Sequence, residues 1–280
     1  MDDANALGDY LKARRDLVQP EDVGILTGTG GGAGGPRRVP GLRREEVAML
    51  AGVSADYYLR LEQGRDRNPS VQVIEALARV LQLDSAATAY LVALSQPRAK
   101  KTTRRRPEIV PAGIRQLLGV IGLPAFVEGR YFDVLAANPL ATALSPRLVP
   151  GSNRLRAVFL DPDEKALYPD WDRAIAGMVA GFRASVGTDT TDPQCIQLVG
   201  ELAVASEPFR RLWARHDVRV LEGEPTRIRH PQLGDLLLSR EKLAVGGTDG
   251  QLLVIYHGEP DSETAGLMAL LGSVAATPGE

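Results

Sequence analysis

The 280-residue sequence has little cysteine, little histidine and no long apolar run, and each scarcity excludes a class of protein. The single cysteine, Cys195, excludes an internal disulfide and a zinc finger held by several thiolates. The 3 histidines form neither an i, i+4 pair nor an H-E-x-x-H motif, so they indicate no metal site. No apolar run approaches the roughly 18 residues of a membrane helix, and the first residues lack the pattern of a signal peptide. We therefore expect a cytoplasmic protein that does not bind a membrane.

Catalytic motifs are also missing. No G-x-S-x-G nucleophile elbow occurs, and Cys195 lies in an apolar helical segment where an inert buried thiol is expected. Residues 30–35 satisfy G-x-G-x-x-G, but a Pro-Arg-Arg-Val-Pro segment follows them where a dinucleotide site needs the start of a helix. The sequence therefore predicts no enzyme and no cofactor, and a hydrolase or dinucleotide enzyme is kept only as a third hypothesis.

The formal net charge of −2 conceals an uneven distribution of charge. Residues 36–106 contain 14 basic and 7 acidic side chains, whereas residues 111–280 contain 16 basic and 21 acidic ones. Proteins that bind DNA neutralise its phosphates with Lys and Arg. The first part of the chain is therefore the candidate for DNA binding.

Residues 42–70 predict two short helices joined by a tight turn. Gly52 suits the left-handed end of the first helix, and Ser54 suits the N-cap of the second. Tyr58 and Leu61, three residues apart, should face inward, which leaves other side chains of that helix free to enter a DNA groove. Ser70 should cap a further amphipathic helix. The predicted inward positions on these helices and on a first helix at residues 6–18 include Leu7, Leu11, Leu17, Val47, Ala48, Leu50, Val53, Val71, Ile74, Leu77, Ala78 and Leu81.

This segment resembles the XRE (lambda-repressor-like) helix-turn-helix over about residues 7–95. The resemblance implies that Arg44 contacts a phosphate or a base edge and that Ala55, Asp56 and Arg60 occupy base-reading positions. An αα-hairpin that packs against another protein is the alternative. The candidate DNA-binding residues are Arg43, Arg44, Ser54, Ala55, Asp56, Tyr57, Arg60, Arg65 and Arg67.

Composition divides the chain into residues 1–95, a basic linker at 96–110 and residues 111–280. A glycine-rich loop at 24–41 carries Arg37 and Arg38, which either reach DNA phosphates and a minor groove or stay solvated. Prolines bracket the linker cations, so the linker should be extended, as a tether or as a DNA contact. These linker cations are Lys100, Lys101, Arg104, Arg105 and Arg106.

Beyond Pro111 the pattern mixes helices and strands. We expect a short helix near residues 114–121, a hairpin at 125–136 that turns at Glu128 and Gly129, and a helix at Pro139 capped by Asn138. Three more helices are predicted at residues 170–186, 193–205 and 208–214. Strands are predicted at residues 226–230, 236–239, 241–245 and 252–256. Antiparallel strands with inserted helices predict a curved sheet around a pocket.

Several motifs in this half resemble the MmyB-like ligand-binding domain over about residues 108–275. They are GRYFDVLAAN at 129–138, FLDP at 159–162, DW at 170–171, SEPFRRLWARHDVR at 206–219 and HPQLG at 230–234. The resemblance implies a PAS-like fold and a small, largely apolar ligand, with long-chain fatty acids as the first candidate. The fold class is thus an all-α helix-turn-helix domain followed by an α+β PAS-like domain, an antiparallel sheet with inserted helices.

The candidate ligand-binding residues lie on the helices predicted to cover the sheet. Arg183 either pairs with a ligand carboxylate or with an internal acid, and His216 either binds that carboxylate or holds the following turn. The aromatic candidates either contact the ligand or pack the core. They are Trp171, Phe182, Phe209 and Trp213.

Together these features predict a homodimeric transcription regulator that binds a double-stranded DNA operator and senses an apolar effector. Two-fold symmetry is expected because one helix-turn-helix covers only a half-site. The rival hypothesis is a DNA-binding regulator whose second domain serves only dimerisation or protein contacts.

Overall fold

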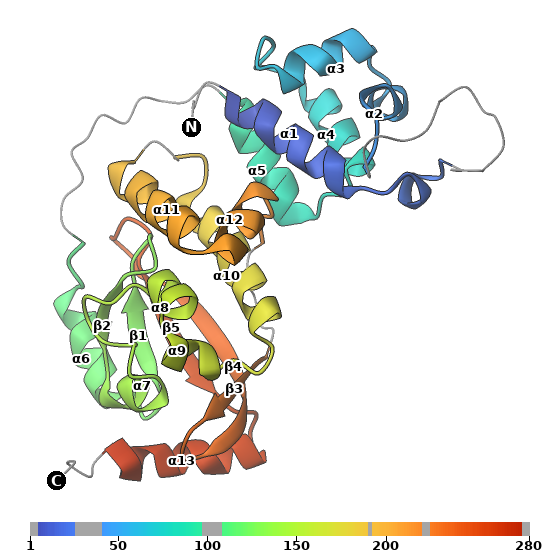
Figure 1. Ribbon diagram of the computed structural model, residues 1–280. Coiled ribbons are helices and arrows are strands. Elements are labelled where there is room, and N and C mark those ends of the chain that lie inside the picture. The colour runs from blue at the N-terminus through green and yellow to red at the C-terminus, as the bar shows by residue number, and fades with distance from the viewer. Residues whose placement is uncertain (1–4, 26–40, 97–107, 190–191, 220–224, 276–280) are drawn as a thin grey trace. The chain divides into compact units, whose positions relative to one another are not determined.

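The computed structural model describes residues 5–25, 41–96, 108–189, 192–219 and 225–275 (Figure 1). The chain forms two compact units. The first unit comprises residues 1–102 with the short segments 187–192 and 211–219, and the second comprises residues 103–186, 193–210 and 220–280. Within the described ranges, no helix is both long and apolar enough to cross a membrane.

The first unit is helical. Gly52 ends α2 in the left-handed conformation (φ 69°), and the Ser54 and Ser70 side chains cap the next two helices, as predicted. Its elements are α1 (Ala6–Leu17), the 3₁₀ helix η2 (Pro20–Val23), α2 (Arg44–Ala51), α3 (Ala55–Glu62), α4 (Val71–Val80) and α5 (Ser85–Ser95).

The core of the helical unit is made mainly of the predicted inward side chains. Tyr58 and Leu61 are fully buried. Three predictions are wrong: Leu17 is 37% exposed, Leu50 39% and Val71 66%. All three lie in the first or last turn of a helix, where the neighbouring turn that would cover the side chain is missing. Val18, just beyond α1, is buried where Leu17 was expected.

The second unit is built on a five-stranded antiparallel sheet with the order β2-β1-β5-β4-β3. All the predicted strands occur, but two of them, at 236–239 and 241–245, are halves of one strand, because Arg240 pairs with Tyr256 and continues the ladder. The strands are β1 (Ala125–Glu128), β2 (Val134–Ala137), β3 (Thr226–His230), β4 (Gly234–Ala244) and β5 (Leu252–His257).

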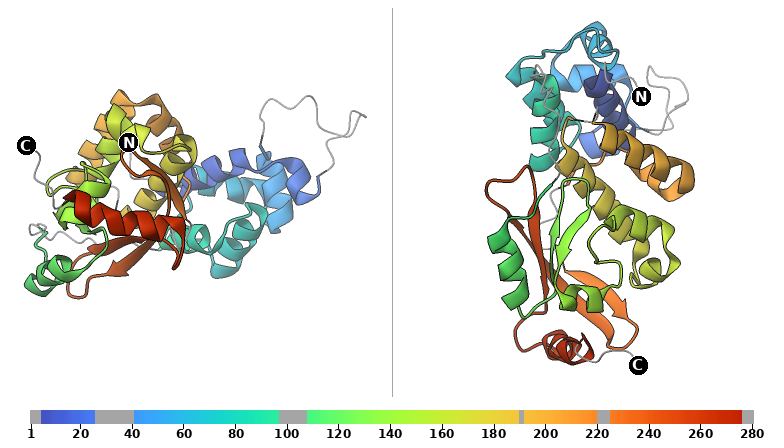
Figure 2. Two further views of the ribbon diagram at one scale, coloured as in Figure 1. Left: turned by 90° about the horizontal axis from the view of Figure 1, so that it is seen from below. Right: turned by 90° about the vertical axis from the view of Figure 1, so that its left-hand side faces the viewer.

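The two faces of this sheet carry different helices. Phe126, Leu236 and Val254 belong to the core on one face, whereas Val127 and Leu253 belong to the core on the other. The right-hand view of Figure 2 shows α6 (Ala112–Val120) on one side of the sheet and α8 and α9, two of the helices inserted between β2 and β3, on the other. These inserted helices are α7 (Pro139–Leu144), α8 (Arg154–Leu160), α9 (Pro162–Ala166), α10 (Trp171–Val186), α11 (Pro193–Ala205) and α12 (Glu207–Ala214).

Asn138 caps α7 as predicted, since its side-chain oxygen accepts a hydrogen bond from the Ala141 N–H at 2.9 Å. The predicted hairpin turn is displaced. Glu128 is the last residue of β1 and is fully buried, and the connection to β2 runs over residues 129–133. Three helices of the second unit were not predicted, α8, α9 and the last helix, α13 (Glu263–Ala275), and neither were η2 and α5 of the first unit.

Candidate functional site

The outward face of α3 is polar near its N-terminus. The Ser54 hydroxyl accepts a hydrogen bond from the Tyr57 N–H at 3.1 Å, and Ala55 and Asp56 are exposed. Arg60, one turn later, forms an ion pair with Asp56, and its guanidinium lies 5.7 Å from the centre of the Tyr57 ring. Asp56, Tyr57 and Arg60 therefore lie together, and the ion pair holds the Arg60 cation on this face.

Arg43 and Arg44 lie at the start of α2. Arg43 is the N-cap residue, and its backbone N–H donates a hydrogen bond to the Glu46 carboxylate at 2.7 Å. The Arg44 guanidinium is bound to Glu62 at 2.5 Å, yet 45% of its side chain is exposed. Arg44 is thus held by an internal partner while part of it stays accessible to a phosphate.

Glu62 is a buried acid between two arginines, and the sequence reasoning missed it. Its other carboxylate oxygen accepts a hydrogen bond from the Arg15 Nε at 2.7 Å, and Arg15 also donates to the Leu42 carbonyl at 2.8 Å. Burial opposes the charge of Arg15, but Glu62 outweighs it and raises the pKa of Arg15. We call Arg15, Arg44 and Glu62 the Glu62 network. The sequence signal for Glu62 was its spacing of four residues from the inward-facing Tyr58, which places Glu62 on the inward face of α3.

The other predicted DNA contacts follow α3 or lie outside the described residues. Arg65 and Arg67 are exposed, and the Arg67 Nε donates to the Gly64 carbonyl at 2.9 Å. The linker cations between residues 100 and 106, Arg37, Arg38 and most of the glycine-rich loop fall outside the described ranges.

The predicted aromatic ligand contacts of the second unit pack against other rings. Trp171 and Phe209 both contact Phe159, with ring centres 6.1 and 5.3 Å apart. Phe182 is fully buried and meets Phe132 edge to face at 5.5 Å. The structure therefore brings Trp171 and Phe209 together and places Phe182 in a different ring pair.

The remaining ligand candidates do not share a unit. Arg183 is buried in the second unit, with 3% of its surface exposed. Trp213 and His216 belong to the first unit, where the His216 ring lies 6.3 Å from the Tyr10 ring. Arg183 and His216, the two predicted binders of a ligand carboxylate, thus occur in different compact units.

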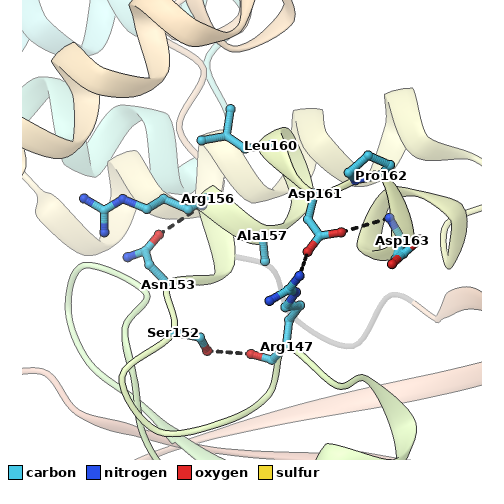
Figure 3. A pocket seen from close by; sticks show the side chains of 9 residues that line it. All are labelled: Arg147, Ser152, Asn153, Arg156, Ala157, Leu160, Asp161, Pro162 and Asp163. Atoms are coloured by element: carbon cyan, nitrogen blue, oxygen red, sulfur yellow. Dashed lines mark hydrogen bonds and ion pairs between the residues drawn. The ribbon is translucent and has the colours of Figure 1, made fainter.

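A hollow of about 520 Å³ opens beside α8 (Figure 3). Three of its charged side chains are paired: Arg147 pairs with Asp161, and Arg156 binds Glu201 through two nitrogens. Walls with several charged side chains do not suit an apolar ligand. The lining residues are Arg147, Ser152, Asn153, Arg156, Ala157, Leu160, Asp161, Pro162 and Asp163.

A second hollow, of about 440 Å³, lies between α6 and β2. Leu118 and Leu135 contribute apolar walls and Arg115 a cation. None of the six predicted ligand-binding residues lines either of these two hollows.

A group of buried charges lies on the inserted-helix face of the sheet. Glu128 forms ion pairs with Arg154 of α8 and, at 2.7 Å, with Lys242 of β4. Arg154 also donates to the Tyr256 hydroxyl at 3.3 Å, and its guanidinium lies 5.2 Å from the centre of the Phe126 ring. We call Glu128, Arg154 and Lys242 the interior charge cluster.

The electrostatics of this cluster are strongly perturbed. Burial alone would raise the pKa of Glu128, but Lys242 and Arg154 lower it to about 2. Burial lowers the pKa of Lys242, and Glu128 offsets only part of this effect because the charges of Arg154 and Arg240 add to it. Such shifts are concentrated at functional sites. The signal in the sequence was the alternation Leu236, Leu238, Arg240 and Lys242, which places two cations on the inward face of one strand.

Comparison with family models matches both halves of the chain. Residues 6–91 match the model of a helix-turn-helix domain, and residues 110–271 match that of the MmyB-like transcription regulator ligand binding domain. Both resemblances seen in the sequence are therefore confirmed, and neither family is one of enzymes. Comparison with curated proteins gives no match. The ligand-binding model alone covers more than half of the sequence, and the chain belongs to the transcription regulators that have an MmyB-like ligand-binding domain behind a helix-turn-helix domain.

Proposed function

We propose that the chain is a sequence-specific regulator whose α3 reads a DNA operator in the major groove and whose second domain senses an apolar, fatty-acid-like molecule. The observation that carries the proposal is the outward face of α3, where Ala55 and Asp56 are exposed and Arg60 is held beside them. Recognition helices contact base edges with the side chains near their N-terminus. Arg60 can pair with a guanine edge or a phosphate once it exchanges Asp56 for DNA.

The other DNA contacts in the proposal surround this face. Arg43 and Arg44 start α2, Ser54 and Tyr57 flank the exposed turn, and Arg65 and Arg67 follow α3. Arginines in such positions fix the orientation of a protein on the phosphate backbone. Because one helix-turn-helix reads a half-site, the proposal includes a cytoplasmic homodimer on a two-fold symmetric operator.

The ligand-binding proposal is supported by the second unit. An antiparallel sheet with helices inserted between β2 and β3 agrees with a PAS-like domain. Its inserted-helix face carries a continuous apolar core that includes Phe126, Val134 and Leu238. Each methylene that a ligand buries contributes about 0.8 kcal/mol, so a hydrocarbon chain gains affinity from such walls with few polar contacts. Phe182 is the strongest aromatic candidate, because its ring contacts Phe132 beside the interior charge cluster.

The proposal is tested by the lipid content of the protein as it is purified from cells. Solvent extraction followed by mass spectrometry should give a fatty acid or similar lipid in near-stoichiometric amount. An unrelated DNA-binding protein purified in the same way is the control and should carry none.

The rival function, a second domain for protein contacts alone, predicts a different result. Purified protein would carry no lipid, and a broad lipid panel would change neither the melting temperature nor the affinity for DNA. A dimer that persisted under these conditions would then favour the rival.

A further inference from the structure

The interior of the second unit carries more positive than negative charge around Glu128. Arg154 and Lys242 share this single carboxylate, and the charge of Arg240 acts on Lys242 from the same face of β4. The Nε of Arg240 is buried and has no hydrogen-bond partner within the described part of the chain. A second acid, Glu164, lies near Arg154 and accepts a hydrogen bond from the Ser145 hydroxyl at 2.6 Å, so three cations face two acids. A buried excess of cations is costly unless an anion compensates it.

The cations of this region differ in their exposure to solvent. Glu128 and Arg154 are closed off, with side chains 0% and 6% exposed. Lys242 is 18% exposed, and Arg240 is partly buried. An anion that enters from solvent would therefore meet Lys242 and Arg240 before the inner ion pair.

The turn before β2 brings an aromatic ring next to Lys242. Phe132 has a φ of 65°, a left-handed conformation that a bulky side chain rarely adopts. In this backbone conformation the Phe132 ring lies 5.0 Å from the Lys242 ammonium and 5.5 Å from the Phe182 ring. The cationic end of the site thus adjoins buried apolar side chains, since Phe132 is 2% and Phe182 0% exposed.

We propose that Lys242 and Arg240 bind the carboxylate of an acidic effector whose apolar body extends over Phe132 and Phe182. This inference rests on the proposed function and names the charged end of the ligand, which the family match leaves open. The carboxylate supplies the missing negative charge, and the ammonium of Lys242 donates to it without giving up its bond to Glu128, because an ammonium has three N–H donors.

The test compares decanoate with 1-decanol, which has the same chain but no charge, on the full-length protein by titration calorimetry. The wild type should bind decanoate at least about tenfold more tightly, since one charge-assisted hydrogen bond separates the two probes. Lys242→Met should abolish this preference and leave 1-decanol within about twofold. Arg240→Met, which leaves the Glu128 ion pairs intact, should reduce the preference in the same direction. Lys12→Met, at an exposed lysine on α1, is the matched control and should behave as wild type.

The outcomes separate the inference from the proposed function. Equal binding of the two probes by the wild type overturns the inference but is compatible with a sensor of apolar molecules. This comparison needs no variant, so it tests the inference even if neither variant folds. Decanoate binding that is lost in Arg183→Met but kept in Lys242→Met also overturns the inference, because Arg183 would then bind the carboxylate. Binding of neither probe by the wild type overturns both the inference and a fatty-acid-like effector.

Discussion

The two domains each bury one carboxylate between two cations, but these cations differ in their exposure to solvent. In the Glu62 network, Arg15 is buried while the Arg44 side chain is 45% exposed at the start of α2. In the interior charge cluster, Arg154 and Lys242 are both largely buried, and Arg240 adds a third cation nearby. The helical domain therefore turns one cation, Arg44, towards solvent, where a large polyanion can reach it. The sheet domain keeps its spare charge inside, where only a small molecule can.

The largest expected effect comes from removing the acid of the Glu62 network. Glu62→Gln removes the buried partner of Arg15 and leaves only the ion pair with the half-exposed Asp16, and breaking a buried pair costs up to about 3–5 kcal/mol of unfolding free energy. Urea denaturation followed by circular dichroism measures the cost. Glu75→Gln, at an exposed position on α4, should stay within about 0.5 kcal/mol of wild type. A loss below about 1 kcal/mol for Glu62→Gln would show that the network does not hold the helices together.

The second-largest effect is the pH dependence of the stability that the interior charge cluster gives to the folded protein. The pKa of Glu128 falls from an ordinary value of 4.5 to about 2 in the folded protein. A lowered pKa stabilises the folded state above about pH 4.5, and the stabilisation is lost as the pH falls towards 2. The free energy of unfolding of the wild type should exceed that of Glu128→Gln by roughly 3 kcal/mol at pH 6, and the two free energies should converge near pH 2.

The measurement is the free energy of unfolding at several pH values for both proteins. Glu241→Gln, at an exposed position on the opposite face of β4, is the control and should differ little from wild type at any pH. A difference between wild type and Glu128→Gln that stays constant from pH 6 to pH 2 contradicts an ionised, doubly paired Glu128.

A third variant tests the outward face of α3. Arg60→Ala should cost about 1–3 kcal/mol of affinity for DNA that the protein has selected from a random pool. Its melting temperature should stay near that of wild type, because an exposed i, i+4 ion pair contributes only about 0.3–0.5 kcal/mol. Arg79→Ala, an exposed cation on α4, is the matched control. Unchanged DNA binding by Arg60→Ala would remove Arg60 from the interface.

The smallest effect concerns the cap of α3. Ser54→Ala should cost about 1 kcal/mol of stability, whereas Ser54→Gly should cost only a few tenths, since glycine tolerates the N-cap position better than alanine. Chemical denaturation of the two variants and wild type gives both values. Equal losses in the two variants would contradict the expected tolerance of glycine at this N-cap, and no loss in either would show that the hydrogen bond from the Tyr57 N–H does not stabilise this helix.

The comparison also explains which features could be predicted from the sequence. Helix ends were predictable where a single residue has a local role, such as Gly52 with its left-handed backbone and Ser54 or Asn138 with its cap. These roles depend on neighbours in the chain, and the periodicity of apolar residues then locates the buried face. The antiparallel sheet with inserted helices followed in the same way.

The buried charges could not be predicted, because their partners are distant in sequence. Glu128 was assigned to a turn, since an acid before glycine is typical of one, and its partners Arg154 and Lys242 lie 26 and 114 residues away. Arg154 is on α8, a helix with a short apolar pattern that was not predicted. Arg240 interrupted the apolar alternation of β4 and so divided one strand into two predictions. Charged residues are assigned to the surface by default, and only tertiary contacts show the exception.

The central claim is that ligand binding in one domain changes DNA binding by the other. The most direct test measures the dissociation constant of the full-length protein for its selected DNA with and without decanoate at a concentration that saturates the protein by calorimetry. The account predicts a change of at least about fivefold, in line with ordinary coupling between two sites. The same dissociation constant with and without bound decanoate would contradict it, because an effector must bind the two DNA-binding states unequally to regulate.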